Sequence, residues 1–301
     1  MASSPLHVIL NTRSGTGHAD AILREVASWF AARGVEATVH AVKPGEDVAQ
    51  AARAALDAGA RTVVAAGGDG TVSAVSAVLA GKDVAMGVLP MGTLNHFARD
   101  LGIPADPAEA AGVIARGHRT KVDVGEVNGR LFVNNASLGI YPDIVRDRTR
   151  QQRRLGRGKY WAMLWATHAV MRRSPFMHLR LEIDGQASTF KAPFVFVGNN
   201  DYVMEGFAIG QRASLRDGLL SIYTTTRRTR LGLLGLVARA LVGRLRQADD
   251  FVMTAARTMR IESRKQRLFV ATDGEVTLMD LPLRFSVHPA ALPVLVPGPA
   301  S

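Results

Sequence analysis

Ala65-Ala66-Gly67-Gly68-Asp69-Gly70-Thr71 follows the short apolar run 62–64 and precedes a segment with helical character. A strand that ends in glycines and opens into a helix is typical of a phosphate-binding loop. Glycine lets backbone N–H groups approach the ligand, and the helix N-terminus adds partial positive charge. Asp69 would repel a phosphate unless a divalent cation lies between them, so the stretch indicates a nucleotide-and-metal site. A glycine turn with a helix-capping Asp is the alternative.

Strand and helix patterns alternate on both sides of this stretch. Short apolar runs predict strands, and longer segments with helical spacing follow them. The expected strands are 6–10, 35–42, 61–66 and 84–89, and the expected helices are 19–33, 44–58 and 71–79. This alternation predicts a Rossmann-like, mostly parallel sheet with helices on its faces.

A second polar loop, Pro90 to Arg99, comes directly after the strand at 84–89. Pro90 ends the strand, Gly92 permits a tight turn, and Thr93 or Asn95 can cap the helix that follows. On its own the loop could be no more than a helix cap. Loops that follow neighbouring parallel strands lie at the same end of the sheet, however, and this favours one shared nucleotide site.

From about Lys121 onward the patterns are those of antiparallel β-structure. Asn128-Gly129 and Asp184-Gly185 are hairpin turn signals, expected to join 122–127 to 131–134 and 179–183 to 190–197. Further expected strands are 219–224, 258–262, 268–272 and 283–287. We therefore predict a C-terminal antiparallel β-sandwich.

The predicted division has three parts. Residues 1–123 form a nucleotide-binding α/β domain, and residues 124–288 form the β-sandwich, which carries a basic helical insertion near 142–173. The tail 289–301 is apolar over 290–296 and is expected to return to the first domain.

Composition excludes several kinds of chemistry. The 301 residues include no cysteine, which excludes disulfides, thiol nucleophiles and Cys-ligated zinc, and the eight histidines show no HExxH spacing. The N-terminus has no basic region of the kind that opens a signal peptide, so a cytoplasmic location is expected.

The net charge of +11 is concentrated in one segment. Between Arg146 and Arg173, nine basic residues stand against one acid, a local excess of +8, with Trp161 and Trp165 among apolar residues at helical spacing. Such a helix is typical of binding in the plane of an anionic membrane interface. A solvated helix packed through its tryptophans and a nucleic-acid surface are the alternatives.

We expect an anionic membrane surface as the partner, and no nucleic acid. The protein would then be cytoplasmic and peripheral at the inner membrane surface, with 227–246 extending the same basic surface. The sequence carries no signal for the oligomeric state, for which a homodimer is one option.

The phosphate site has no Walker A lysine, since no GxxxxGK[ST] string occurs, and the HRD and DFG motifs of protein kinases are absent too. Phosphoryl transfer needs a cation on the phosphates and a carboxylate that accepts the proton of the attacking hydroxyl. Asp273 and Glu275 are candidates for that carboxylate, although Asp-Gly is also a turn signal. Asp217 precedes Gly218 and indicates either another turn or a loop cation site built with backbone carbonyls.

Taken together, these motifs resemble the diacylglycerol kinase catalytic-domain family. That family includes soluble bacterial lipid kinases of the YegS type and the sphingosine and ceramide kinases. The resemblance covers nearly the whole chain and rests on Gly67 to Thr71, Pro90 to Arg99, Asp217-Gly218 and Asp273 to Glu275, in that order.

The resemblance implies ATP and Mg²⁺ as cofactors and an interdomain cleft in which a lipid hydroxyl receives the γ-phosphate. It implies catalytic roles for Glu275, Asp273 and Asp69, the last serving metal and phosphates. The implied nucleotide contacts are Asn11, Ser14, Ala66, Gly67, Gly68, Asp69, Gly70, Thr71 and Thr93. Asp217, with backbone carbonyls such as those of Ser214 and Leu219, matches a structural magnesium loop.

The chain departs from the family pattern at Ser73-Ala74, where Asn-Glu is common, and at His96, where Asp is common. We predict an ATP- and Mg²⁺-dependent lipid kinase acting on diacylglycerol or a sphingoid-like lipid. An NAD kinase-like enzyme and a non-catalytic, nucleotide-regulated membrane-binding module are the alternatives.

Overall fold

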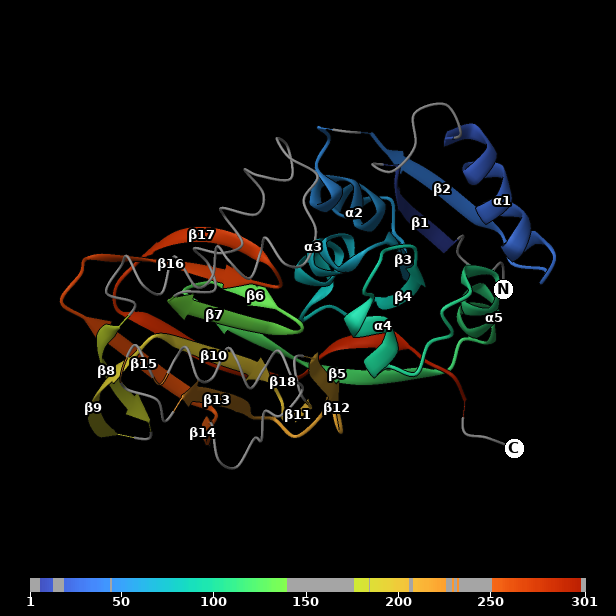
Figure 1. Cartoon of the computed structure of the whole chain (residues 1–301). Coiled ribbons are helices and arrows are strands. Elements are labelled where there is room, and N and C mark those ends of the chain that lie inside the picture. The colour runs from blue at the N-terminus through green and yellow to red at the C-terminus, as the bar shows by residue number, and fades with distance from the viewer. Residues whose placement is uncertain are drawn as a thin grey trace. The chain divides into compact units, whose positions relative to one another are not determined.

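The computed structural model describes residues 6–12, 19–43, 45–139, 176–183, 185–205, 208–225, 229, 232 and 251–298. The chain divides into two units, Met1–Val124 with Pro289–Ser301 and Gly125–His288 (Figure 1). The basic insertion near 142–173 and Ser14 lie outside the described residues, as does nearly all of 227–246. Each unit is described by itself below.

The first unit alternates strands and helices. Its elements are β1 (Leu6–Asn11), α1 (Ala19–Ala31), β2 (Ala37–Val42), α2 (Val48–Asp57), β3 (Thr62–Gly67), α3 (Asp69–Leu79), β4 (Ala85–Pro90), α4 (His96–Asp100) and α5 (Pro107–Arg116). Strands β1, β3 and β4 are apolar almost throughout because both faces of a parallel sheet are covered by helices. The Asp47 carboxylate accepts the Ala49 N–H at 2.8 Å and so caps α2.

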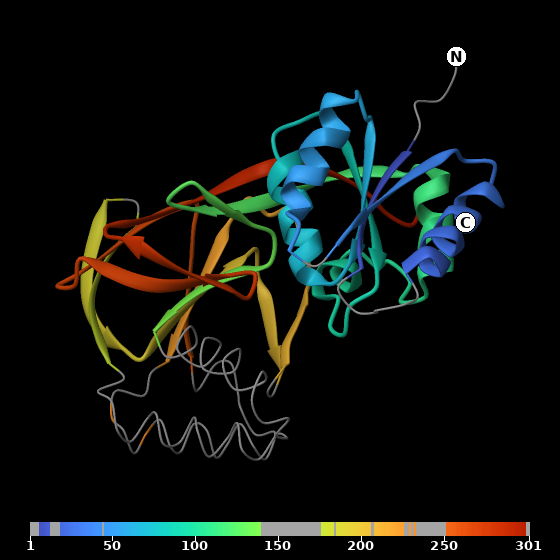
Figure 2. The same ribbon diagram turned by 90° about the horizontal axis from the view of Figure 1, so that it is seen from above.

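The parallel strands lie in the order β2-β1-β3-β4. Helices α2 and α3 pack together on one face of this sheet, and α1 and α5 pack together on the other (Figures 1 and 2). The chain leaves β1 toward β2 and then crosses back to β3, so the order reverses between β1 and β3. In open α/β sheets such a reversal leaves a crevice outside the carboxyl ends of the strands, where ligands bind.

The second unit is antiparallel. Its own elements are β6 (Arg130–Phe132), β7 (Asn135–Gly139), β8 (Met177–Ile183), β9 (Gln186–Ala192), β10 (Phe194–Asn199), β11 (Tyr202–Glu205), β12 (Ala208–Arg212), β13 (Leu220–Thr225), β14 (Phe251–Ala256), β15 (Thr258–Ser263), β16 (Arg267–Thr272) and β17 (Glu275–Asp280). One sheet has the order β14-β13-β10-β7-β16-β17, and β15, β8 and β9 belong to the other. Apolar side chains from both sheets form one core, which confirms the expected β-sandwich.

One expected strand is wrong. The segment 190–197 is two strands, β9 and β10, which break at Pro193 and belong to different sheets. Proline cannot donate to a strand ladder, so it ends β9. The partner of β8 in the hairpin is therefore Gln186–Ala192, in which Phe190 lies opposite Leu179.

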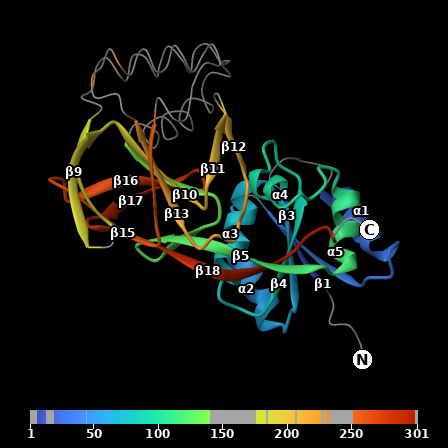
Figure 3. The same cartoon turned by 90° about the horizontal axis from the view of Figure 1, so that it is seen from below.

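Two strands, β5 (Arg119–Val127) and β18 (Leu283–Leu295), run from one unit into the other and pair with each other (Figure 3). The end of β18 lies beside β4, where Val294 is in register with Met86. The Gly81 N–H also donates to the Ala291 carbonyl at 2.8 Å. Among the helices of the described residues, none is long and apolar enough to span a bilayer.

Candidate active site

The loops after β3 and β4 touch each other. A β-carbon on Gly92 would lie 2.5 Å from the Gly68 Cα, and one on Gly68 would lie 3.3 Å from the Gly92 Cα. The Met91 N–H donates to the Gly67 carbonyl at 3.0 Å. The structure therefore brings these two predicted loops together, and glycine is required at position 92 because the Gly68 backbone leaves no room for a side chain there.

Thr71 connects the same loop to β1. Its buried hydroxyl lies against Gly67, where a β-carbon would come within 2.5 Å of Thr71 Oγ1. The Asn11 side chain, at the end of β1, donates to the same hydroxyl at 3.0 Å. Residues from the carboxyl ends of β1, β3 and β4 thus meet at the point where the strand order reverses.

Asp69 is the first residue of α3, and Gly68 occupies the N-cap without a side-chain cap bond. The helix-capping alternative for Asp69 is therefore wrong. Its Oδ1 is buried and has no hydrogen-bond partner within the described part of the chain. A carboxylate oxygen buried in this way is costly unless a cation or a donor meets it. The atom thus fits a divalent cation or the donor group of a ligand.

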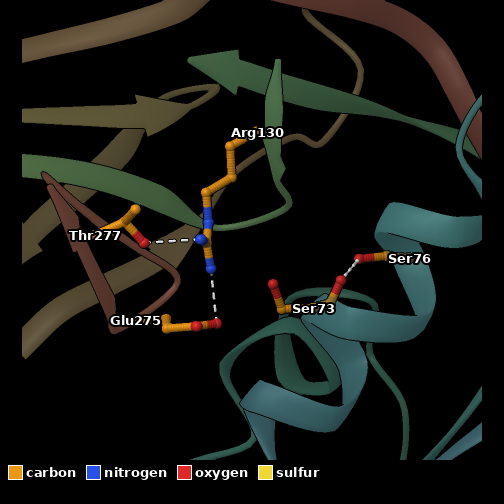
Figure 4. A network of polar contacts seen from close by, with 5 residues as sticks. All are labelled: Ser73, Ser76, Arg130, Glu275 and Thr277. Carbon is orange, nitrogen blue, oxygen red and sulfur yellow. Dashed lines mark hydrogen bonds and ion pairs between the residues drawn. The ribbon is translucent and has the colours of Figure 1, made fainter. Parts of the chain in front are cut away.

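Helix α3 begins immediately beyond this glycine junction. The Thr71 N–H already donates to the Gly68 carbonyl at 2.9 Å. The N–H groups of a helix ahead of that first bond have no acceptor within the helix, so they are available to a phosphate. Ser73 and Ser76, on the next turns, are bonded to each other, since the Ser76 hydroxyl donates to the Ser73 carbonyl at 2.9 Å (Figure 4). The Ser76 hydroxyl is therefore used within the helix.

The loop after β4 closes on itself through Asn95. The Asn95 side chain accepts the Gly92 N–H and donates to the Gly92 carbonyl, each at 2.9 Å. Asn95 is the N-cap residue of α4 but makes no side-chain cap bond, because its amide is used in this turn. The predicted position of the cap is therefore confirmed at Asn95, but the side-chain cap bond is absent. Thr93 is exposed within the turn, and His96 Nδ1 lies 2.9 Å from the Arg99 guanidinium.

In the second unit, Asp273 holds the segment between β6 and β7. Its Oδ2 accepts the Val133 N–H at 2.9 Å, and its Oδ1 accepts the N–H groups of Asn134 and Asn135 at 2.8 and 3.1 Å. Asp273 and Gly274 both have positive φ, as in the type I′ turn expected for a two-residue hairpin. Asp273 is thus both a turn residue and an anchor.

Glu275 is the first residue of β17, and its exposure and its contacts differ sharply from those of Asp273. Its side chain is 76% exposed, and Oε2 lies 2.7 Å from Nη2 of Arg130. The other terminal nitrogen of Arg130 donates to the Thr277 hydroxyl at 2.7 Å, so the guanidinium lies between two residues of β17 (Figure 4). Sequence reasoning did not single out Arg130 or Thr277, because no motif spacing connects residues so far apart in the chain.

A buried arginine supports the segment that Asp273 anchors. Arg212 is 5% exposed and donates to the Val133 carbonyl at 2.6 Å and to Asn134 Oδ1 at 3.0 Å. The N–H groups of residues 133–135 thus bind a carboxylate, while oxygens of the same segment bind a guanidinium. Charged groups of opposite sign fix this segment from both sides.

The predicted magnesium loop lies between β12 and β13. Asp217 is exposed, the Ser214 hydroxyl accepts the Arg216 N–H at 3.1 Å, and the Leu219 carbonyl accepts the Asn200 N–H at 2.9 Å. Oxygen donors of this kind suit Mg²⁺, and each accepting oxygen keeps a second lone pair. In the parts of the chain that the structure describes, no three His, Asp or Glu side chains gather as a metal site.

Comparisons with known proteins give one family-model match in the N-terminal part of the chain and one in the C-terminal part. The family model of the diacylglycerol kinase catalytic domain matches residues 5–127, and that of the YegS C-terminal NAD kinase beta sandwich-like domain matches residues 137–296. The chain belongs to the diacylglycerol kinase catalytic-domain family.

Among its relatives, the diacylglycerol kinase of Mycobacterium tuberculosis (strain ATCC 25618 / H37Rv) is 32% identical over 300 residues, covering 96% of this chain and 94% of that protein. A probable lipid kinase, YegS-like, of Pseudomonas aeruginosa PAO1 is 32% identical over 276 residues, covering 88% and 86%. The crystal structure of a diacylglycerol kinase from Bacillus anthracis str. Sterne shares the fold, with a TM-score of 0.71, 20% identity and coverage of 99% and 98%.

Proposed function

We propose that the protein is a lipid kinase that transfers the γ-phosphate of ATP to the hydroxyl of a lipid such as diacylglycerol. The proposal is supported by family membership and by the kinase activities for which the relatives are named. The observation that carries it is the junction of glycine loops at the carboxyl ends of β1, β3 and β4, beside the buried Asp69 Oδ1.

The nucleotide would bind at this junction. The N–H groups at the start of α3 would contact the phosphates, and Asn11 and Thr93 border the same loops. Asp69 would hold Mg²⁺, whose charge neutralises the phosphates during transfer. A second Mg²⁺ bound by Asp217 and the oxygens of Ser214 and Leu219 would have a structural role.

Glu275 is the better candidate for the base. Both oxygens of Asp273 accept backbone N–H groups, whereas Glu275 is exposed and has one oxygen beyond its ion pair. In the proposed step, Glu275 removes the proton of the lipid hydroxyl as its oxygen attacks the γ-phosphorus. The bond from that phosphorus to the bridging oxygen breaks, and ADP leaves.

The lipid would be reached at an anionic membrane surface. The excess of +8 between Arg146 and Arg173 would attract anionic headgroups, with about 1 kcal/mol from each basic side chain near the surface. Binding of this kind is peripheral and weakens at high salt.

The experiment is phosphate transfer from γ-labelled ATP in the presence of Mg²⁺. Separate reactions offer vesicles with diacylglycerol, vesicles with a ceramide or sphingoid base, and NAD in solution. Labelled phosphatidic acid is the expected product. The NAD arm is included because the C-terminal family model is described as NAD kinase-like. Labelled NADP would replace the proposal with an NAD kinase, and ATP binding without any labelled product would support a non-catalytic module.

A further inference from the structure

We propose that Arg130 is a positioning residue that orients the Glu275 carboxylate for proton removal. The inference rests on the proposed function, because it assigns Arg130 a part in the same reaction. Arg130 would act through Glu275 and would not contact the substrate.

The contacts of Arg130 define one orientation of its guanidinium. Nη2 lies 2.7 Å from Glu275 Oε2, and Nη1 donates to Thr277 Oγ1 at 2.7 Å. Residues i and i+2 of a strand lie on the same face, so Glu275 and Thr277 meet the guanidinium from one side of β17. The planar fork of arginine suits two such acceptors, whereas a lysine ammonium offers only a point charge.

The backbone that carries Arg130 is held in place. The Asn128 side chain accepts the Arg284 N–H at 2.7 Å and donates to the Asp280 carbonyl at 3.0 Å, which ties the turn before β6 to β17 and β18. Beyond β6, the Asp273 carboxylate binds the N–H groups of residues 133–135. Arg130 therefore lies on a short strand that is fastened at both ends.

The backbone that carries Glu275 is held by the same anchor. The Asp273 N–H donates to the Asn135 carbonyl at 2.9 Å, and Glu275 lies opposite Thr272 across the turn. Asp273 thus fixes the spacing between the segment of Arg130 and the segment of Glu275. The ion pair therefore joins two segments that the contacts of Asp273 already hold together.

This arrangement leaves one carboxylate oxygen for chemistry. Oε2 is bound by Arg130, and for Oε1 no partner exists among the described residues. Fixing one oxygen restricts rotation of the carboxyl group and directs the other oxygen. An ordinary surface ion pair contributes little to stability, so the expected effect of Arg130 is on turnover and not on folding.

The chain supplies a matched control on the same hairpin. Arg267 pairs with Asp280 at 2.7 Å, at the end of β16 and β17 away from the turn, and both side chains are exposed. Arg267→Met removes an arginine–carboxylate pair of the same kind from the same two strands. It is expected to leave turnover unchanged.

The test measures kcat and KM for diacylglycerol phosphorylation, together with the thermal unfolding midpoint. Arg130→Met is expected to lower kcat about 100-fold with little change in the KM for ATP or lipid. Arg130→Lys keeps the charge and should recover about tenfold of that loss. Glu275→Gln alone should lower kcat about 1000-fold, and Arg130→Met added to it should lower kcat no further.

The following outcomes would overturn the inference. An active wild type with unchanged kcat in Arg130→Met would remove Arg130 from the reaction. Additive losses in the double variant would mean that Arg130 contacts substrate directly. If Arg130→Met does not fold, the activities of Arg130→Lys and Thr277→Val test the inference instead. Full activity in both variants would contradict a role of Arg130 in orienting Glu275. A wild type without any kinase activity would overturn the proposed function, and this inference with it.

Discussion

The Cα of Gly68 lies so close to Gly92 that a β-carbon on Gly92 would come within 2.5 Å of it. The loops after β3 and β4 therefore meet backbone to backbone. This contact brings the two loops together at one place, and a side chain at Gly92 would force them apart.

We expect Gly92→Ala to lower ATP affinity at least tenfold and to lower the unfolding midpoint. The added methyl would also come within 2.8 Å of Asn95 Oδ1, so it could be accommodated only by breaking the Asn95 turn or by moving the Gly68 loop away. Isothermal calorimetry with ATP measures the first effect and thermal unfolding the second. Gly70→Ala is the control for stability, because nothing lies within 4 Å of a β-carbon there. Equal midpoints in the two variants would contradict the steric argument.

Asp69→Asn is expected to change the dependence of ATP binding on Mg²⁺. The wild-type carboxylate repels phosphate when no cation is present, so the amide should strengthen ATP binding in EDTA and weaken it in excess Mg²⁺. Equilibrium binding in the two buffers checks both directions. A uniform loss of affinity in both would indicate a structural role for Asp69 instead.

Asp273→Asn is expected to destabilise the second unit by about 2–4 kcal/mol, because the N–H groups of residues 133–135 lose a charged acceptor. Asparagine tolerates the positive φ of this position, so the variant isolates the hydrogen bonds from backbone strain. Denaturant unfolding gives the change. Glu275→Gln, on the next strand, should leave stability within about 0.5 kcal/mol of the wild type. A stable Asp273→Asn that lacks turnover would instead favour Asp273 as the base.

The first unit should lose stability as the solution becomes acidic. His7 Nδ1 lies 2.9 Å from His40 Nε2 on the neighbouring strand, and burial together with His7 lowers the pKa of His40 below its usual 6.5. The unfolded chain therefore binds a proton more readily than the folded one. The stability that neutral His40 contributes is complete above pH 6.5 and is lost as the pH falls toward the folded pKa.

Unfolding midpoints between pH 7.5 and 5.0 measure this loss. His40→Asn should flatten the dependence, whereas His118→Asn, at an exposed position of the same unit, should not. Identical pH dependence in the wild type and His40→Asn would contradict the assignment to this pair.

Much of the fold could be predicted because its signals are local. The apolar runs of β1, β3 and β4, each followed by a polar loop, specify a buried parallel sheet. Asn128-Gly129 marked a hairpin correctly, and both residues have positive φ in the structure. The strand at 190–197 was wrong because the apolar residues 194–197 were joined to Phe190 across Pro193, which ends one strand before the next begins.

The site was less predictable for a physical reason. The glycine loops can be recognised from their composition. The different roles of Asp273 and Glu275, however, depend on which backbone N–H groups of a segment far away in the sequence reach each carboxylate. Arg130 and Arg212 have no local signature at all, because their roles come from contacts with residues far away in the sequence. Only the folded chain distinguishes an anchoring carboxylate from an available one.

The return of β18 to β4 has a consequence for how the protein is made. Val294 and Ala291 complete an edge of the first unit, yet they are synthesised after every residue of the second unit. During synthesis on the ribosome, the edge of β4 that pairs with β18 therefore stays unpaired until the residues of the β-sandwich have been made. The sheet of the first unit, although its other strands are made first, can therefore be completed only after the whole second unit has been synthesised.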